Sequence, residues 1–372
     1  MGTEELQILY SFYSLYSLYS FCNFYSPLCN HMLPSVFNCS NDMALAAGVN
    51  HYVPPKRIQQ MESDLASLSR WWHDTCFAGP WGWSAATKRR YRLMGIDESL
   101  LPSDAWLAEV RRLSSREHAC LYIERMLRDE SLPLAHLVGE HMRFCRQADL
   151  QAMERQAEEQ ETMEQAGEQS LPASQRSLIF KSPWSSSGRG VFVARGMDER
   201  SLSRLRGFVS SQGGFAMDLF YERKLVDFAM EYYLDGEGTA IFLGYSVFSA
   251  GEGGAYGFNY VEPQSALIER IGVAPELLAS LRAYHAAHLA SMPYRGVVGI
   301  DMMKVLDADG KEKVHPCVEI NLRMNMGVLA LILWQKMGSS GFLADTVELT
   351  EPREHGFQAV VDHGKLMIRF KR

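Results

Sequence analysis

Four polar residues near the C-terminal end of the chain have types and spacing suited to phosphate chemistry. Glu319, Asn321 and Arg323 occupy alternate positions in the run EINLR, and alternate residues of a strand share a face. Asp301 lies in an earlier apolar run, and a hairpin register that pairs it with Glu319 would complete the set. Two carboxylates and a carboxamide suit magnesium carrying nucleotide phosphates, and a guanidinium binds phosphoryl or carboxylate oxygens. The alternative is an internal ion pair between Glu319 and Arg323.

The segment KSPWSSSGRG, which begins at Lys181, is a second candidate. Apolar runs at 178–180 and 191–194 flank it, which predicts a β-hairpin with a tip rich in Ser and Gly. Backbone N–H groups and hydroxyls at such a tip can approach a ligand closely, and Lys181 and Arg189 add positive charge. Because the segment lacks the G-K-[ST] of a Walker A loop, we interpret it as a different loop that folds over phosphates. The alternative is a plain turn.

Acidic residues also lie between these two candidates. Asp227 and Glu231 belong to the strand-like run LVDFAMEYY, which follows Asp218. Acids at these positions could bind ribose hydroxyls or a second metal ion; the alternative is that they are surface residues.

Strands and helices must hold these residues in place. Two apolar runs on either side of Asp307-Ala308-Asp309-Gly310 predict a second hairpin, which carries Asp301 and Glu319. Apolar residues at helical spacing predict helices within 58–68, 105–113 and 117–127. Residues 147–176 hold many Gln and Glu and few apolar residues, which predicts a polar helix or a linker. His285 and His288 lie three apart on a predicted helix, and we interpret them as ordinary helix-face residues because no third ligand is near in sequence.

Composition narrows the class of protein. The 372 residues are 47% hydrophobic and 22% charged, which is typical of a folded globular chain. With 37 basic and 44 acidic residues the formal charge is -7, and no basic run suits a nucleic-acid backbone, so we expect no nucleic-acid partner. No apolar stretch has the length of a membrane span, so we expect no membrane partner. The seven cysteines include no C-x-x-C pair, which favours a reducing compartment and a cytoplasmic location over a disulfide framework or a zinc site.

The N-terminal residues 1–31 differ from the rest of the sequence. Residues 9–27 repeat Tyr, Phe, Leu and Ser in short units, and Glu4 and Glu5 stand where a signal peptide would have basic residues. We interpret this stretch as a low-complexity tail: either a poorly ordered segment of the protein or an upstream stretch included by a mistaken start, for which Met32 is the expected true start.

Taken in order, these elements resemble the ATP-grasp superfamily, from about residue 113 to the C-terminus. The loop KSPWSSSGRG and the run EINLRMNMG are similar to motifs of an uncharacterised bacterial branch, as is the run GAYGFN at 254–259. The segment FNCSNDMALA near the start resembles the leading region of that branch. The resemblance implies an α+β ATP-grasp fold, in which two α+β lobes hold ATP. It also implies that a small α/β pre-ATP-grasp domain, residues 32–112, precedes the ATP-grasp domain, residues 113–372.

The resemblance also implies roles for individual residues. Lys181 would contact phosphates. Asp218 would stand near adenine and ribose, and Asp227 or Glu231 would assist it there. Arg323 and Lys181 would be the catalytic pair, with Arg323 stabilising charge on the transferred phosphoryl group. The magnesium ligands would be Asp301, Glu319 and Asn321. The residues implied to bind ATP are Lys181, Ser185, Ser186, Ser187, Gly188, Arg189, Gly190, Asp218, Asp227, Glu231 and Arg116. The sequence match at Arg116 is short, and Asp218 stands where Glu is more usual.

The activity implied is that of an ATP- and magnesium-dependent ligase. Two Mg2+ ions are expected, with Mn2+ able to substitute. A carboxylate of a small molecule or peptide would become an acyl phosphate, which an amine or thiol would capture. Two alternatives share the same residues: a small-molecule kinase of the ATP-grasp kind, and a nucleotide-binding module without turnover.

Overall fold

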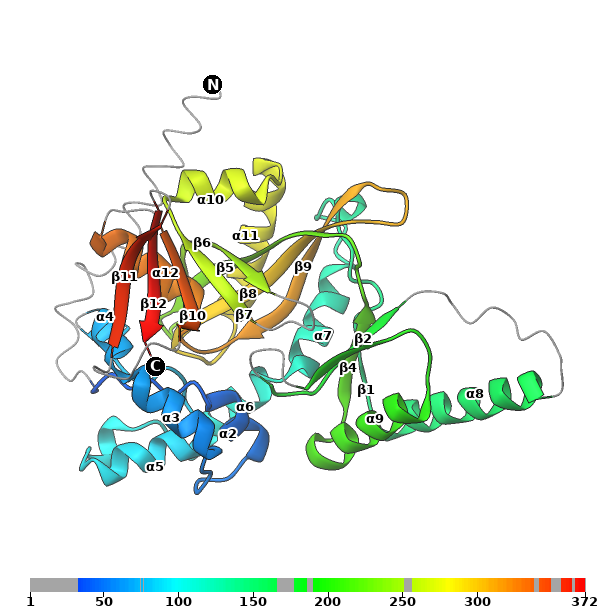
Figure 1. Ribbon diagram of the computed structural model, residues 1–372, viewed down its shortest axis with the longest axis horizontal. Helices are drawn as coiled ribbons and strands as arrows, with labels where there is room; N and C mark the ends of the chain where they lie inside the picture. The colour runs from blue at the N-terminus through cyan, green and yellow to red at the C-terminus, as the bar shows by residue number, and fades with distance from the viewer. Residues whose placement is uncertain are drawn as a thin grey trace.

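The computed structural model describes residues 33–73, 75, 77–165, 177–185, 190–250, 256–337, 341–348, 356–362 and 365–371. The tail 1–31 and most of the Ser/Gly loop, Ser186, Ser187, Gly188 and Arg189, therefore lie outside the described residues. Two α+β lobes and a set of N-terminal helices make up the described chain (Figure 1). The α+β class and the two-lobed arrangement expected from the sequence are confirmed.

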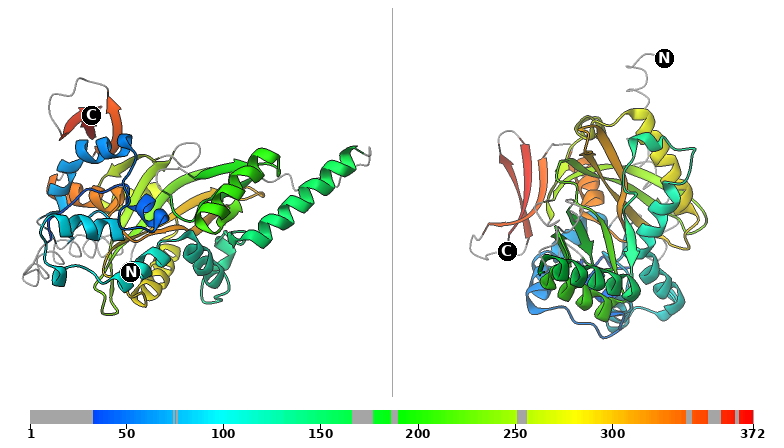
Figure 2. Two further views of the ribbon diagram at one scale, coloured as in Figure 1. Left: turned by 90° about the horizontal axis from the view of Figure 1, so that it is seen from below. Right: turned by 90° about the vertical axis from the view of Figure 1, so that its right-hand side faces the viewer.

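The smaller lobe is a four-stranded sheet with two helices. Its strands, in spatial order, are β1 (Arg143–Cys145), β4 (Phe215–Leu219), β2 (Leu178–Lys181) and β3 (Val191–Ala194). The helices are α8 (Gln147–Gln165), which projects away from the body, and α9 (Glu199–Gln212) (Figure 2). Three phenylalanines in ring contact, Phe180, Phe192 and Phe215, form the centre of its core. The antiparallel pairing of β2 with β3 confirms the predicted hairpin.

The larger lobe is an eight-stranded sheet. In spatial order its strands are β11 (Gly356–Asp362), β12 (Lys365–Lys371), β10 (Gly341–Glu348), β7 (Tyr256–Val261), β6 (Ala240–Ala250), β5 (Lys224–Leu234), β8 (Gly296–Leu306) and β9 (Glu312–Asn321). Three helices pack against it: α10 (Gln264–Ile271), α11 (Pro275–Ala290) and α12 (Met326–Met337). The predicted hairpin register is confirmed, since β8 and β9 are antiparallel and pair Asp301 with Glu319.

The N-terminal helices cover one end of the large sheet. They are α2 (Asn41–Ala47), α3 (Lys56–Asp64), η2 (Ala66–Ser69), α4 (Arg70–His73), α5 (Ala85–Leu93), η3 (Glu98–Leu100) and α6 (Asp104–Leu113). The expected α/β character of this region is corrected, because within its described residues Val36 makes only an isolated β-bridge, with Pro80. Helix α6 buries Leu107, Val110 and Leu113, which are apolar residues at helical spacing, and Trp72 and Trp81 join the main core.

Helix α7 (Arg116–Met126) connects the two lobes, because it packs against β1 and β4 on one side and β9 on the other. The short η4 (Leu134–His136) follows it. The Ser115 hydroxyl caps α7 by accepting a hydrogen bond from the Glu117 N–H. Arg116, the first residue of the helix, is thereby fixed at the junction of the lobes.

A buried aromatic stack links α7 to α11. The Tyr122 hydroxyl lies 2.5 Å from His285 Nδ1, and the Tyr122 ring stacks on His288 with ring centroids 4.0 Å apart. Burial, and next the neighbouring His288, lowers the pKa of His285 to about 3. His285 is therefore a neutral residue of the core, whereas His288 is half-buried on the same helix. In the part of the chain that the structure describes, no helix combines the length and apolar character needed to cross a bilayer.

The Tyr122→Phe substitution should lower the free energy of unfolding by roughly 1–3 kcal/mol, because it leaves a buried imidazole nitrogen without its hydrogen-bond partner. Urea denaturation would measure the change. Tyr284→Phe is the matched control, since its ring contacts Tyr122 but no hydrogen bond of its hydroxyl is part of the stack. Equal stability of the Tyr122→Phe variant and the wild type would show that this hydrogen bond contributes nothing.

Candidate functional site

A cavity of about 900 Å³ lies between the two lobes and reaches the N-terminal helices. Strands of both sheets line it, as does the connection between β4 and β5. The predicted site residues that line it are Lys181, Ser185, Asp218, Asp227, Glu231, Asp301, Glu319, Asn321, Arg323 and Arg116. The structure thus brings together every predicted site residue that it describes, apart from Gly190, whose carbonyl closes the loop beside the cavity by accepting a hydrogen bond from the Ser182 N–H.

Three strands of the large sheet supply the acidic floor of this cavity. One row of side chains across the sheet is formed by Ala229, Asp301 and Glu319. The next row on the same face is formed by Glu231, Gly299 and Asn321. Rows on one face are about 7 Å apart along the strands. Four polar side chains therefore meet within a short distance because of strand register alone.

Asp301 is an acid without a cationic partner among the described residues. Burial raises its pKa well above the usual range, and the carboxylates of Glu319 and Glu231 raise it further. Its Oδ2 accepts a hydrogen bond of 3.0 Å from Asn321 Nδ2. Among the residues the structure describes, no lysine or arginine forms an ion pair with Asp301. An oxygen-rich position of this kind fits a divalent cation, which would neutralise the charge.

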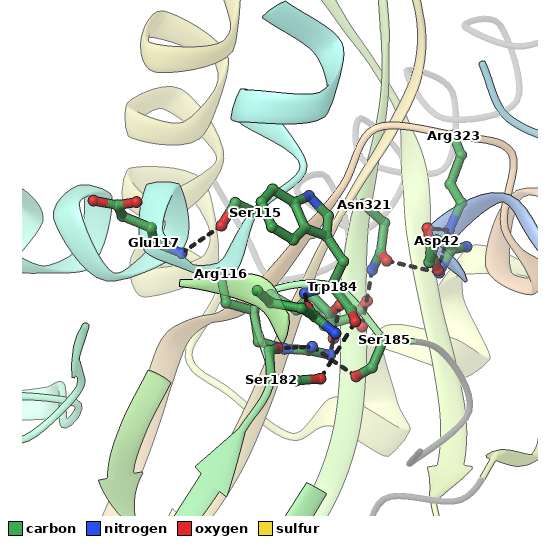
Figure 3. A network of polar contacts seen from close by, with 12 residues as sticks. Asp42, Ser115, Arg116, Glu117, Ser182, Trp184, Ser185, Asn321 and Arg323 are labelled. Atoms are coloured by element: carbon green, nitrogen blue, oxygen red, sulfur yellow. Dashed lines mark hydrogen bonds and ion pairs between the residues drawn. The ribbon is translucent and has the colours of Figure 1, made fainter. Parts of the chain in front are cut away.

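Arg116 joins Glu319 of β9 to the loop that follows β2. Figure 3 shows its guanidinium beside Ser182 and Ser185 of that loop. Its Nη2 donates to both carboxylate oxygens of Glu319, at 2.8 and 2.9 Å, and its Nη1 donates to the Ser182 carbonyl and the Ser185 hydroxyl, each at 2.7 Å. The guanidinium is 5% exposed, so this contact is shielded from water. The weak sequence match at Arg116 thus falls on a residue that spans the lobes.

Arg323 has a different partner from the one considered in the sequence. The alternative of an internal pair with Glu319 is excluded, because Arg323 pairs with Asp42 of α2, its Nη2 3.0 Å and its Nε 3.1 Å from the carboxylate (Figure 3). Its Nη2 also donates to Asn321 Oδ1 at 2.9 Å, and its Nη1 to the Met324 carbonyl. Asp42 is far away in sequence, so only the fold brings these two residues together.

Lys181 is a cation that faces the cavity without a carboxylate partner. It ends β2, and no carboxylate of the described residues lies within ion-pairing distance of its Nζ. Burial lowers its pKa, and Arg116 adds to the effect, while Asp218 and Glu319 oppose it. A cation placed in this way suits an anionic ligand that brings its own charge.

The remaining predicted acids differ in their surroundings. Asp218 Oδ2 lies 2.9 Å from His315 Nε2 of β9, so this acid links the small lobe to the large one. Asp227 pairs with Lys224 at 2.5 Å, and burial raises its pKa.

Glu231 is 1% exposed and accepts hydrogen bonds from Ser246 Oγ (2.8 Å) and Asn325 Nδ2 (2.7 Å). Burial raises its pKa to about 7, and these two hydrogen bonds only partly offset that rise. The alternative of a surface position is wrong for Glu231, which lies at the buried end of the cavity floor, beneath the start of α12.

Several polar residues of this site were not predicted to belong to it. Among them are Asp42, Ser246 and Asn325, which line the cavity, and His315, which contacts Asp218. Asp42 stands in the FNCSNDMALA segment, which the resemblance had already singled out, and Asn325 lies just after the EINLR run. Ser246 and His315 carry no signal in the sequence, since each gains its place from strand pairing alone.

Comparisons with known proteins give structural similarities only. No family model and no curated protein matches the chain. The chain is similar in structure to the biotin carboxylase domain of 2-oxoglutarate carboxylase from Hydrogenobacter thermophilus (14% identity, TM-score 0.38, 61% of this chain and 46% of that chain). It is also similar to D-alanyl-alanine synthetase A from Vibrio cholerae (12%, 0.37, 59% and 57%). A third is carboxyaminoimidazole ribonucleotide synthase from Aspergillus clavatus (14%, 0.36, 58% and 46%). The matched part is therefore about half the length of each of these proteins.

The Glu231→Gln substitution should remove a pH dependence of stability. Between pH 4.5 and about 7 the folded protein holds a proton on Glu231 that the unfolded chain has released. The free energy of unfolding of the wild type should therefore fall as pH rises through this window, by roughly 3 kcal/mol, because one pKa unit corresponds to about 1.4 kcal/mol. Urea denaturation at several pH values would show a flatter profile for the variant.

Glu237→Gln, which changes an exposed turn residue, is the control and should keep the wild-type profile. The same slope in wild type and Glu231→Gln would show that Glu231 is ionised in the folded protein at acidic pH.

Proposed function

We propose that this chain is an ATP-grasp enzyme that binds ATP with magnesium in the cavity between its lobes and acts as a ligase. The observation that carries the proposal is the placement of the unpaired Lys181 on one wall of the cavity, opposite the acidic floor of Asp301, Glu319 and Asn321. A nucleotide triphosphate with a divalent cation neutralises both surfaces at once.

The phosphate loop would hold the triphosphate. Lys181 would pair with phosphate oxygens, and Ser185 is already positioned through its hydrogen bond with Arg116. Arg116 carries a buried positive charge between this loop and Glu319, so we assign it to the phosphate side of the site. Residues 186–189 extend the same loop and are proposed to cover the phosphates.

Asp218 and Asp227 would serve the nucleoside end of the ligand. Asp218 lies on the final strand of the small lobe, immediately before the connection to β5, and Asp227 lies two positions before Ala229 on the cavity face. We propose that they bind around adenine and ribose. Glu231 lies on the other side of the Asp301 row and is already bonded to Ser246 and Asn325, so it is assigned to the floor of the site and not to ribose.

Asp301, Glu319 and Asn321 would hold magnesium. Bound there, the ion would neutralise the phosphate oxygens that the reaction makes more negative. For Glu319 this requires that its carboxylate be shared between the cation and Arg116, which has contacts with both of its oxygens. Arg323 contributes positive charge from the far side of Asn321.

The reaction proposed is transfer of the terminal phosphoryl group to a carboxylate, followed by attack of an amine or thiol on the acyl phosphate. Positioning and charge neutralisation account for most of such a reaction. The described floor and loop agree with this demand, since they offer carboxylates for a cation and positive charge and hydrogen-bond donors for phosphate.

The Lys181→Ala substitution should weaken binding of ATP with magnesium by roughly 1–3 kcal/mol, because a charge-assisted contact with phosphate is lost. Isothermal titration calorimetry on the full chain would measure the change. Lys311→Ala, which changes an exposed lysine in the turn between β8 and β9, should bind ATP as the wild type does. Wild-type protein that is folded but does not bind ATP at millimolar concentration would contradict the proposed function itself.

Product analysis would separate the ligase from its alternatives. A ligase releases ADP and inorganic phosphate only when both a carboxylate and an amine or thiol are supplied. A kinase would release ADP together with a stable phosphorylated product. A binding module would release no ADP and form no phosphorylated product.

A further inference from the structure

Asp42 is held in a fixed place beside the proposed metal site. It lies in the first turn of α2, and the Ser40 N–H and hydroxyl that precede it both donate to Glu62, at 2.9 and 2.6 Å. The Asn38 amide donates to the Gly82 carbonyl and to Thr87. The Asp42 side chain is 13% exposed and points to Arg323 (Figure 3). Its position is thus set by the N-terminal helices, not by the sheet.

A continuous chain of contacts runs from Asp42 to the acidic floor. The Asp42 carboxylate accepts from Arg323 Nε and Nη2, Arg323 Nη2 donates to Asn321 Oδ1, and Asn321 Nδ2 donates to Asp301 Oδ2. The orientation of the Asn321 carboxamide is fixed at both ends by this chain. Removal of the Asp42 carboxylate would release Arg323, which holds the Asn321 carboxamide.

The charge of Asp42 has a second consequence. A guanidinium that is 17% exposed needs a counter-charge, and Asp42 is the nearest acid, ahead of Glu319 and Asp301 in its effect on the pKa of Arg323. If Asp42 lost its charge, Arg323 would be drawn toward Glu319 and Asp301, the two carboxylates assigned to magnesium. Asp42 therefore keeps Arg323 from competing with the cation.

We infer that Asp42 is a positioning residue through which the N-terminal helices complete the magnesium site. It fixes Arg323 and thereby the Asn321 carboxamide, whose Oδ1 would be shared between Arg323 and the cation, and it keeps Arg323 away from Asp301 and Glu319. The inference rests on the proposed ATP and magnesium site. Partners in the layer behind metal ligands commonly change metal affinity by 10–100-fold when they are altered.

The test compares ATP binding with and without magnesium in the full chain. Calorimetry gives the dissociation constant of ATP with excess Mg2+ and with EDTA, and their ratio measures the gain from the metal. In Asp42→Asn this gain should fall about tenfold, while affinity for metal-free ATP stays as in the wild type. Asp42→Glu keeps the charge and should retain most of the gain, and Glu98→Gln, which removes an acid from an exposed ion pair of the N-terminal helices, should retain all of it.

A purely structural role predicts a different result. Asp42→Asn would then melt at a lower temperature but show the full gain from magnesium, and this outcome would overturn the inference. An equal loss in Asp42→Asn and Asp42→Glu would also overturn it, because the negative charge would not be what acts. If Asp42→Asn does not fold, the paired variant Asp42→Asn/Arg323→Gln, which avoids an unpaired buried charge, is compared with Arg323→Gln alone. Because Asp42 acts only through Arg323, the two variants should show the same gain from magnesium; a further loss in the paired variant would overturn the inference. Failure of the wild type to bind ATP would instead contradict the proposed function.

Discussion

Asp301 and Glu319 lie directly opposite each other on β8 and β9, and the rest of the site is arranged around the repulsion between these two carboxylates. Strand pairing forces the contact, and burial of Asp301 strengthens the repulsion by raising the cost of its charge. Positive charge must therefore come from nearby. The site supplies it from two arginines, neither of which neutralises Asp301 directly.

The two arginines divide the work between different parts of the chain. Arg116, at the start of α7, binds Glu319 and the Ser182 carbonyl in the loop after β2, so it connects the small lobe to β9. Arg323, just beyond β9, binds Asp42 and Asn321, so it connects the N-terminal helices to the same strand. Asp301 is left with one amide partner. Among the described residues, Glu319 and Asn321 each contact an arginine and Asp301 contacts none, which is the physical reason to propose a cation beside Asp301.

Close packing beneath the floor depends on residues without side chains. A Cβ on Gly299 would lie 2.5 Å from Asn325 Nδ2 and 2.6 Å from Glu231 Oε2, and a Cβ on Gly327 would collide with Glu231 Oε1. These two glycines let the start of α12 approach the sheet closely enough for Asn325 to reach Glu231. The buried, hydrogen-bonded Glu231 is thus a consequence of backbone approach, which explains why its carboxylate is enclosed while Asp301 faces the cavity.

Local patterns in the amino-acid sequence were enough to predict the hairpins and the residue pairs that they impose. Alternation in EINLR and the turn at Asp307–Gly310 were sufficient to place Asp301 opposite Glu319, because side chains on a strand alternate and a hairpin fixes register. The Lys181 hairpin followed from the same local rules. Two outcomes instead required the folded chain: which acid each arginine binds, and the burial of Glu231. Asp42 and Arg323 are 281 positions apart, and Glu231 is enclosed by Ser246 and Asn325, which are 15 and 94 positions away. Neither propensity nor periodicity carries information on such contacts.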